Sequence, residues 1–168
     1  MRATIVRWDL AIDRKLDRVR GPALDAIAYR LSSAADHSLL WDLCGTLSAI
    51  GRGDDVGFAT RFVGAMGVES LLTNGLVKNA FMRVRPAAYE DLVFSYGLRR
   101  PITSSFPSGH ATAAFCAARL LGDGVGWYAL AAVVGSTRVY VRLHHASDVV
   151  AGAAFGLVLG SVFRRFVR

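Results

Sequence analysis

The stretch AGAAFGLVLGS, residues 151–161, indicates the fold class of this chain. Glycine inside the helix of a water-soluble protein costs about 1 kcal/mol relative to alanine, so three glycines in one apolar run need a physical reason. In a lipid bilayer, small residues let helices approach closely, and packing then holds the helices together. The run therefore favours an all-α integral membrane helical bundle.

Together with this run, the chain has five apolar segments, which would form the bundle. They cover residues 38–51, 57–77, 108–122, 124–141 and 147–164. Only the second segment reaches the ~20 residues of a membrane-spanning helix. Charged residues such as Asp42, Arg61 and Glu69 also interrupt the series. We predict about five spanning helices, and a water-soluble all-α bundle with a very apolar core is the alternative.

The first 36 residues have a different, amphipathic pattern, which predicts two helices separated by Gly21-Pro22. Their apolar stripes are Trp8, Ile12, Leu16 and Val19, then Leu24, Ile27, Ala28 and Leu31. The basic residues beside them are Arg2, Arg7, Arg14, Lys15, Arg18 and Arg20. These helices would lie on an anionic membrane surface or pack on the rest of the chain. We expect one domain, residues 1–168, with interfacial helices in 1–36 and a helical bundle with the active site in 37–168.

The composition excludes several classes of protein. A chain of 168 residues suits one domain, and its 53% hydrophobic content argues against disorder. The same content argues against a nucleic-acid-binding module, despite a net charge of +7. Cys44 and Cys116 are far apart, which predicts buried free thiols rather than a disulfide or a zinc site. The N-terminus lacks the apolar region of a secretory signal.

Residues that carry chemistry gather around one long connection, residues 86–107, whose length is typical of a functional loop. Before it stand Lys78, Arg83, Arg85 and Pro86. Their spacing places Lys78 and Arg85 on one helix face, two turns apart, with Pro86 ending that helix. Taken alone, this cluster is also typical of a basic helix end.

After the connection comes Pro107-Ser108-Gly109-His110, which opens the third segment. Ser108 suits the N-cap of a helix, whose first-turn N–H groups can bind an anion. His110 at this place can donate a proton to a leaving oxygen. An ordinary capped helix is the alternative.

The third cluster is Thr137-Arg138, followed by His144 and Asp148. Asp148 lies one helical turn after His144, so its carboxylate can fix the imidazole tautomer and leave the other nitrogen free to attack. A purely structural His–Asp contact is the alternative, and the role of His145 stays open.

The order of the segments brings the three clusters together. If segments two to five each cross the membrane, all three clusters lie on the same side. One site then holds three cations, a helix N-terminus, two histidines and a carboxylate. Such a set suits a phosphoryl group, whose transfer depends on charge stabilisation and positioning.

The three clusters resemble the signature motifs of the type 2 phosphatidic acid phosphatase superfamily in their order and internal spacing. They extend across residues 78–148. One departure is Thr137, where the family usually has serine; the hydroxyl is kept, so phosphate binding is expected to persist. Membrane members of the family usually have six spanning helices, and here the amphipathic N-terminus replaces the first.

The resemblance implies a phosphatase that needs no metal and no cofactor. His144 would attack phosphorus and form a phosphohistidine, Asp148 would orient His144, and His110 would protonate the leaving oxygen. The phosphate oxygens would be bound by Lys78, Arg85, Ser108, Gly109 and Arg138.

The expected substrate is a lipid phosphate. The size, composition and N-terminal pattern are similar to those of decaprenylphosphoryl-5-phosphoribose phosphatases, which favours a polyprenyl-linked precursor of cell-wall synthesis. Alternatives are undecaprenyl diphosphate, phosphatidic acid and phosphatidylglycerol phosphate. A catalytically silent membrane-binding protein is the alternative of another class.

Basic residues are richer on the side of the site, which predicts a bacterial-type plasma membrane protein whose site faces the cytoplasm. The small-residue face of Gly152, Gly156 and Gly160 would permit a homo-oligomer.

Overall fold

A computed structural model of the chain describes residues 2–51, 55–87, 92, 95–97 and 101–167. The predicted all-α class is confirmed, since these residues contain helices and no strand. The α-helices are α1 (Arg2–Arg18), α2 (Pro22–Ala34), α3 (Leu39–Ile50), α4 (Asp55–Ser70), α6 (Gly109–Leu121), α7 (Val125–Tyr140) and α8 (Ala146–Val167). The shorter elements are η1 (Asp36–Ser38), η2 (Leu71–Val77) and η3 (Lys78–Ala80). Part of the predicted loop 86–107 lies outside the described residues.

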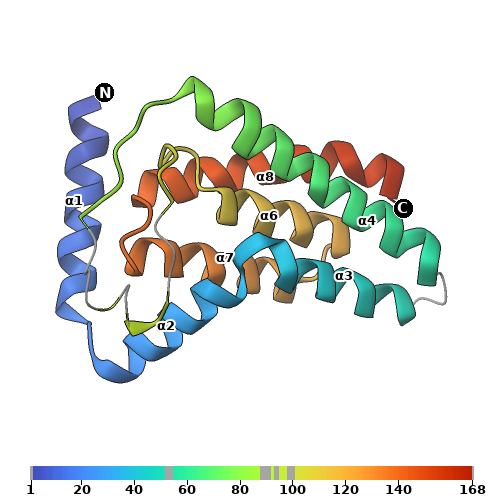
Figure 1. The fold of residues 1–168 in the computed structure, drawn as a ribbon, viewed down its shortest axis with the longest axis horizontal. Helices are drawn as coiled ribbons and strands as arrows, with labels where there is room; N and C mark the ends of the chain where they lie inside the picture. The colour runs from blue at the N-terminus through green and yellow to red at the C-terminus, as the bar shows by residue number, and fades with distance from the viewer. Residues whose placement is uncertain (1, 52–54, 88–91, 93–94, 98–100, 168) are drawn as a thin grey trace.

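The long helices run side by side in alternating directions, while α1 stands across one end of the bundle (Figure 1). The central helix is α6, which packs against α8, α7, α4 and α3. The alternation brings the end of η3, the start of α6, the end of α7 and the start of α8 to the same end as α1 (Figure 1). We call this the α1 end. The opposite end, which carries the loop Gly122–Gly124 and the C-terminus, is the distal end.

Close packing of α6 against α8 depends on the glycines of the opening stretch. A Cβ atom at Gly152 would lie 2.5 Å from the carbonyl oxygen of Ser108, and one at Gly160 would lie 2.9 Å from that of Cys116. A Cβ at Gly156 would overlap the backbone of Thr112 in the same way. This face is therefore covered by α6 of the same chain and is not available to a second chain, while the homo-oligomer itself stays a prediction.

The second apolar segment forms a continuous helical run, but its geometry changes along its length. Its buried residues Phe58, Phe62, Met66, Glu69 and Thr73 follow α-helical spacings of three and four. The next buried residue, Lys78, comes five positions later, after the π-helical element η2. A π-helical stretch adds one residue to a turn, which explains the longer interval.

The helix that carries Lys78 ends at Ala80, so the predicted helix up to Pro86 is wrong. Phe81 has extended backbone angles (φ −127°, ψ 137°), and its ring packs edge-on against Phe106 at 4.7 Å between centroids. The backbone N–H of Ser105 donates to the carbonyl of Arg83 at 3.0 Å. Tertiary contacts with the end of the long connection thus keep residues 81–86 out of the helix that sequence spacing alone indicated.

Both N-terminal helices form, with Pro22 in the first turn of α2 as predicted. Their predicted apolar stripes pack only in part: Ala28 is buried and Leu16 and Leu31 pack against the core. The other large stripe residues Trp8, Val19, Leu24 and Ile27 remain between 41% and 63% exposed. The buried faces of these helices also carry carboxylates. Asp13 pairs with Arg142 at 2.6 Å, and Asp25 accepts the hydroxyl of Tyr140 on α7 at 2.7 Å, so polar contacts help to attach these helices to the bundle.

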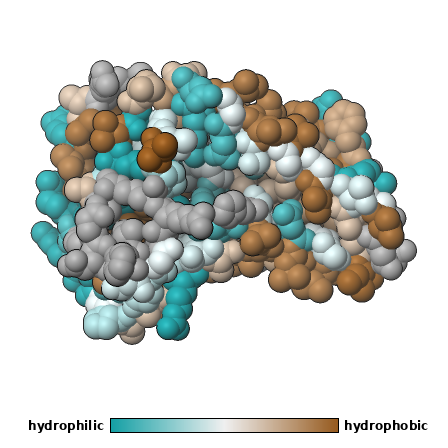
Figure 2. Space-filling view, in the orientation of Figure 1, coloured by the Kyte–Doolittle hydropathy of each residue, from teal (hydrophilic) through white to brown (hydrophobic). Residues whose placement is uncertain are grey.

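Apolar side chains also cover much of the outer surface. On α3, Leu39, Leu43, Leu47 and Ile50 are each more than half exposed. Figure 2 shows hydrophobic surface mostly over the half of the molecule that contains α3 and α4, while hydrophilic surface gathers towards α1 and α2. Among the described helices, only α8 is both long and apolar enough to cross a membrane.

The two cysteines are free thiols. Cys116 is buried as predicted, whereas Cys44 is only partly buried.

Candidate active site

His144 lies at the α1 end, in the connection between α7 and α8, and is 2% exposed. Its Nδ1 lies 2.7 Å from the carbonyl oxygen of Ser105, and its Nε2 lies 3.3 Å from Nη1 of Arg85. A carbonyl can only accept and a guanidinium can only donate, so the proton resides on Nδ1 and the lone pair of Nε2 accepts from Arg85. Burial lowers the pKa of His144 to about 3, so the imidazole is neutral near pH 7.

Asp148 is fully buried in the first turn of α8. Its Oδ2 lies 3.8 Å from Nδ1 of His144, which is an ion-pair distance rather than a hydrogen bond. The same Oδ2 accepts the backbone N–H of His145 at 2.9 Å, and Oδ1 pairs with Arg83 at 2.5 Å. Asp148 therefore places a negative charge beside His144 while the Ser105 carbonyl fixes the tautomer.

Arg85 is held by backbone carbonyls around it. Its Nη1 donates to the carbonyl of Leu143 at 2.6 Å, and its Nε and Nη2 donate to the carbonyls of Thr103 and Ser104 at 3.2 Å each. These bonds fix the guanidinium beside His144.

His110 and Arg138 are linked through a carboxylate that lies outside the motifs. Nε2 of His110 lies 2.7 Å from Oδ1 of Asp36, and Nη1 of Arg138 lies 3.6 Å from the same oxygen. Arg138 is 1% exposed and donates to the hydroxyl of Ser32 at 2.5 Å. Its buried Nε has no hydrogen-bond partner among the described residues. An unpaired buried donor of this kind is available to a ligand.

Lys78 lies against the first turn of α6. Ser108 is the N-cap of α6 as predicted, and its side chain accepts the N–H of Ala111 at 3.4 Å. A Cβ atom at Gly109 would lie 3.4 Å from Nζ of Lys78 and 2.9 Å from Oδ1 of Asn74. The missing side chain at Gly109 thus lets a cation approach the helix N-terminus. Burial, with Arg85 and Arg138 nearby, lowers the pKa of Lys78 to about 8.

Two residues that the sequence left open have local partners. His145 contacts the carbonyl of Val84 at 3.2 Å through Nε2, so it ties the extended segment to the start of α8. The hydroxyl of Thr137 donates to the carbonyl of Val134 at 2.7 Å, inside α7. At this position the hydroxyl is engaged with its own helix.

Sequence reasoning missed four residues of this cluster: Asp9, Ser32, Asp36 and Arg83. Arg83 was visible as a basic residue near the first motif, but its spacing did not distinguish it from a solvated charge. Asp9 bonds Arg83 at 2.7 Å and Asp36 bonds His110, although both lie far from the motifs in sequence. Only the positions of α1 and η1 in space bring these carboxylates to the site.

A cavity of about 430 Å³ opens beside the cluster, lined by residues 82–85 and 101–104. Its lining combines Arg83 and Arg85 with apolar side chains, of which Met82, Val84 and Ile102 are each more than 80% exposed. His144 is not among the lining residues, but Arg85 both lines the cavity and contacts His144.

Buried cations, a helix N-terminus and two histidines at one place are groups that can hold a phosphoryl group. The chain belongs to the PAP2 superfamily, whose family model matches residues 58–168. The resemblance seen in the three motifs is therefore confirmed, and Asp9, Ser32 and Asp36 lie before the matched region.

Relatives at the sequence level are lipid phosphatases by name. The decaprenylphosphoryl-5-phosphoribose phosphatase of Mycobacterium tuberculosis is 30% identical over 84% of this chain and 79% of that protein. A lipid A 1-phosphatase of Rhizobium johnstonii is 42% identical over 56% of this chain. The chain spans less than half the length of that phosphatase, 43%.

Two solved structures share the fold. One is a transmembrane PAP2-type phosphatidylglycerolphosphate phosphatase from Bacillus subtilis, with a TM-score of 0.77, 24% identity and coverage of 97% of this chain and 86% of that one. The other is Aquifex aeolicus LpxE, with a TM-score of 0.70, 25% identity and coverage of 93% and 94%.

Proposed function

We propose that this protein is an integral membrane lipid phosphate phosphatase that works through a phosphohistidine intermediate. The observation that carries the proposal is the fixed tautomer of His144. Its Nδ1 proton is bonded to the Ser105 carbonyl, and Nε2 carries a lone pair beside the guanidinium of Arg85. A buried neutral imidazole with a neighbouring cation suits nucleophilic attack on an anionic phosphoryl group.

The reaction has two steps. His144 Nε2 forms a bond to phosphorus while the bond from phosphorus to the lipid oxygen breaks, and His110 donates a proton to that oxygen. Water then attacks the phosphohistidine and loses a proton to His110, and the N–P bond breaks to release inorganic phosphate. Asp148 stabilises the positive charge that His144 gains, while Lys78, Arg85, Arg138 and the first turn of α6 at Ser108 and Gly109 bind the phosphate oxygens.

The surface supports a lipid as the substrate. The cavity beside Arg85 has an apolar, exposed rim at Met82, Val84 and Ile102, which suits an apolar chain attached to a phosphate. Exposed leucines on α3 and the apolar length of α8 support a membrane location. We propose that the bundle helices span the membrane and that the outward apolar side chains of α1 and α2 contact its surface.

Among lipids, we favour a polyprenyl-linked precursor such as decaprenylphosphoryl-5-phosphoribose, because the relative with that name matches most of both chains. Lipid A, phosphatidylglycerol phosphate, phosphatidic acid and undecaprenyl diphosphate complete the panel to be assayed.

The test is phosphate release by the purified protein from each of these lipids in detergent micelles. We expect turnover of at least one lipid, loss of that turnover in His144→Ala, and its retention in the matched control His145→Ala. Unchanged turnover in His144→Ala would exclude the phosphohistidine mechanism. A folded protein that hydrolyses none of the panel would favour a catalytically silent membrane-binding protein.

We further propose that the site faces the cytoplasm, because the α1 end carries the basic N-terminal helix. The C-terminus lies at the distal end (Figure 1), so a reporter fused there should lie on the opposite side of the membrane from the site. An alkaline phosphatase fusion that is active only outside the cytoplasm should therefore be active. An inactive fusion together with a fluorescent cytoplasmic reporter would reverse the orientation.

A further inference from the structure

Asp9 on α1 reaches the site although it lies 49 positions before the region that the family model matches. Its side chain is buried, and Oδ2 pairs with Nη2 of Arg83 at 2.7 Å. The other nitrogen of that guanidinium, Nη1, pairs with Oδ1 of Asp148 at 2.5 Å. One arginine thus connects a carboxylate of the N-terminal helix to the carboxylate beside His144.

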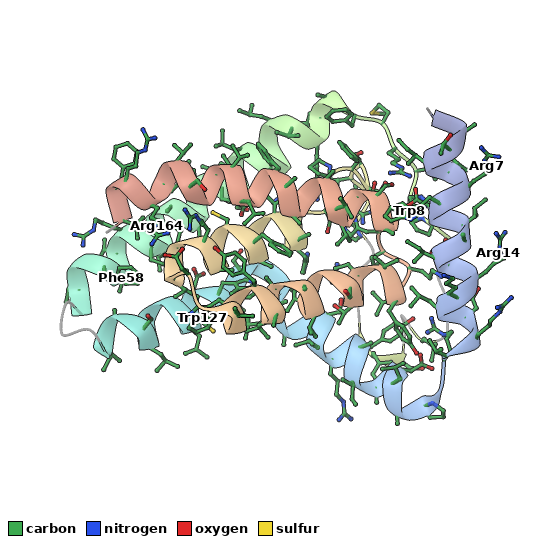
Figure 3. The ribbon with its side chains drawn as sticks, turned by 180° about the vertical axis from the view of Figure 1, so that it is seen from behind. Arg7, Trp8, Arg14, Phe58, Trp127 and Arg164 are labelled. Carbon is green, nitrogen blue, oxygen red and sulfur yellow. The ribbon has the colours of Figure 1, made fainter. Side chains whose placement is uncertain are left out.

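Ser147 closes this network at the start of α8. Its backbone N–H donates to Oδ1 of Asp9 at 2.9 Å, and its hydroxyl donates to Oδ2 at 2.7 Å. Both oxygens of Asp9 are therefore engaged at the active-site end of α8. In Figure 3, Arg7 and Arg14 on the same helix point away from the bundle, so α1 turns its acidic face towards the site.

We propose that Asp9 is a positioning residue of the phosphatase reaction, acting through Arg83 and Asp148 on His144; this rests on the proposed function. With Asp9 present, the positive charge of Arg83 is shared between two carboxylates, and Asp148 keeps negative charge for His144. Without it, Arg83 neutralises Asp148 alone. His144 then lacks the compensation it needs when Nε2 bonds to phosphorus and the ring becomes positive.

The other charged groups around His144 make the negative charge of Asp148 important, because they are mainly positive. Arg85 from the extended segment and Arg138 from α7 both bring positive charge towards the ring, and both oppose a positive phosphohistidine. Asp148 is the carboxylate that acts on the ring in the opposite sense.

The chain offers a matched control one helical turn away. Asp13 is also on α1, is also buried, and pairs with Arg142 at 2.6 Å, with no contact to Arg83 or Asp148 among its described bonds. Asp13→Asn removes the same charge from the same helix. Asp9→Asn keeps an oxygen that can accept the Ser147 N–H but removes the ion pair with Arg83.

Steady-state kinetics with the lipid that the wild-type protein hydrolyses test the proposal. We expect Asp9→Asn to lower kcat about tenfold with KM changed less than about twofold, and Asp13→Asn to leave both within about twofold. In an Arg83→Gln background, Asp9→Asn should cause no further loss of kcat. Equal effects of the two asparagine variants, or a loss that persists without Arg83, would overturn the proposal in favour of helix docking alone.

A measurement without turnover separates this inference from the proposed function. In protein labelled with ¹⁵N-histidine, the chain has four histidines, and the signals of His144 are identified by their loss in His144→Ala. Asp9→Asn should shift the imidazole ¹⁵N resonances of His144, and Asp13→Asn should not. Unchanged resonances in Asp9→Asn would refute the coupling whatever the substrate. A shift in a protein that hydrolyses no lipid would leave the coupling in place and reject the phosphatase.

Discussion

The two ends of the bundle use the same chemical groups in different surroundings. At the distal end, Asp123 pairs with Arg164 through two contacts of 2.7 Å and with Arg119 at 2.5 Å, yet its side chain is 63% exposed. At the α1 end, Asp148 pairs with Arg83 at 2.5 Å and is fully buried. Both ends have short arginine–carboxylate contacts, so contact geometry alone does not distinguish them.

The two ends differ in how deeply their charged groups are buried. Exposed ion pairs contribute about 0–1 kcal/mol, because water and salt screen them. Buried charges lose their hydration and are expensive to keep, so a concentration of them needs either full pairing or a function. Lys78, Arg85, Arg138, His144 and Asp148 are all buried at the α1 end. Burial, and not the number of ion pairs, therefore distinguishes the α1 end, where the candidate site lies, from the distal end.

The largest expected effect separates two arginines, one from each end. Arg85→Gln should lower kcat/KM on the order of a thousandfold, because the phosphoryl group loses a fixed cation beside His144. Arg164→Gln should leave kcat/KM within about twofold, because its exposed partner Asp123 keeps Arg119. Kinetics on the same lipid phosphate check both, with thermal unfolding as the test of folding. Similar losses in the two variants would remove the distinction between the ends.

Two glycines of α8 give the next largest contrast. Gly152→Ala and Gly160→Ala should each destabilise the fold by about 1–3 kcal/mol, because a Cβ at either position overlaps α6. Only Gly152→Ala pushes on Ser108, which caps the helix at the site, so it alone should lower kcat, by about a hundredfold. Denaturant unfolding and kinetics measure the two effects separately. A comparable loss of kcat in Gly160→Ala would show that α6 transmits the strain along its whole length.

A smaller effect is expected for the carboxylates. Asp36→Asn should lower kcat about tenfold, because His110 loses the group that favours its protonated form as a general acid. Asp123→Asn should change kcat less than about twofold. If Asp36→Asn increased turnover instead, the carboxylate would be a competitor of phosphate at His110 and Arg138.

The smallest effect concerns pH. Since the pKa of Lys78 is lowered to about 8, its ammonium is charged below that pH and lost above it. We expect kcat/KM to fall as pH rises through about 8. In Lys78→Arg, whose guanidinium stays charged, we expect this alkaline fall in kcat/KM to disappear. If kcat/KM of Lys78→Arg fell at the same pH, the fall would be due to another titrating group.

The sequence predicted the helices and the meeting of the motifs more completely than the contacts between them. Residues 108–122, 124–141 and 147–164 correspond closely to α6, α7 and α8, because each is a long apolar run bounded by glycine, serine or a motif. Spacing could not show that Phe81 leaves the helix, since the ring of Phe106, 25 positions later, holds it extended.

The N-terminal carboxylates were the least predictable part. An amphipathic pattern predicts that the apolar stripe, here the one with Trp8, faces a membrane surface or packs on the rest of the chain, and it predicts solvent exposure for the charged residues. Asp9 is buried instead, because Arg83 and Ser147 offer it a charge and two hydrogen-bond donors. Such a partner becomes visible only when the distant end of the chain is placed in space.

The π-helical element η2 also changes the direction in which later side chains point around the helix axis. A single extra residue in a helix rotates everything after it by about 100° relative to an uninterrupted α-helix. Phe58, Phe62 and Met66 can therefore keep their contact with the core while Lys78, beyond η2, is turned towards Gly109. Residues 71–77 thus set the direction of the Lys78 side chain relative to the core face of α4. A one-residue deletion there would leave the bundle packed but turn Lys78 away from Gly109.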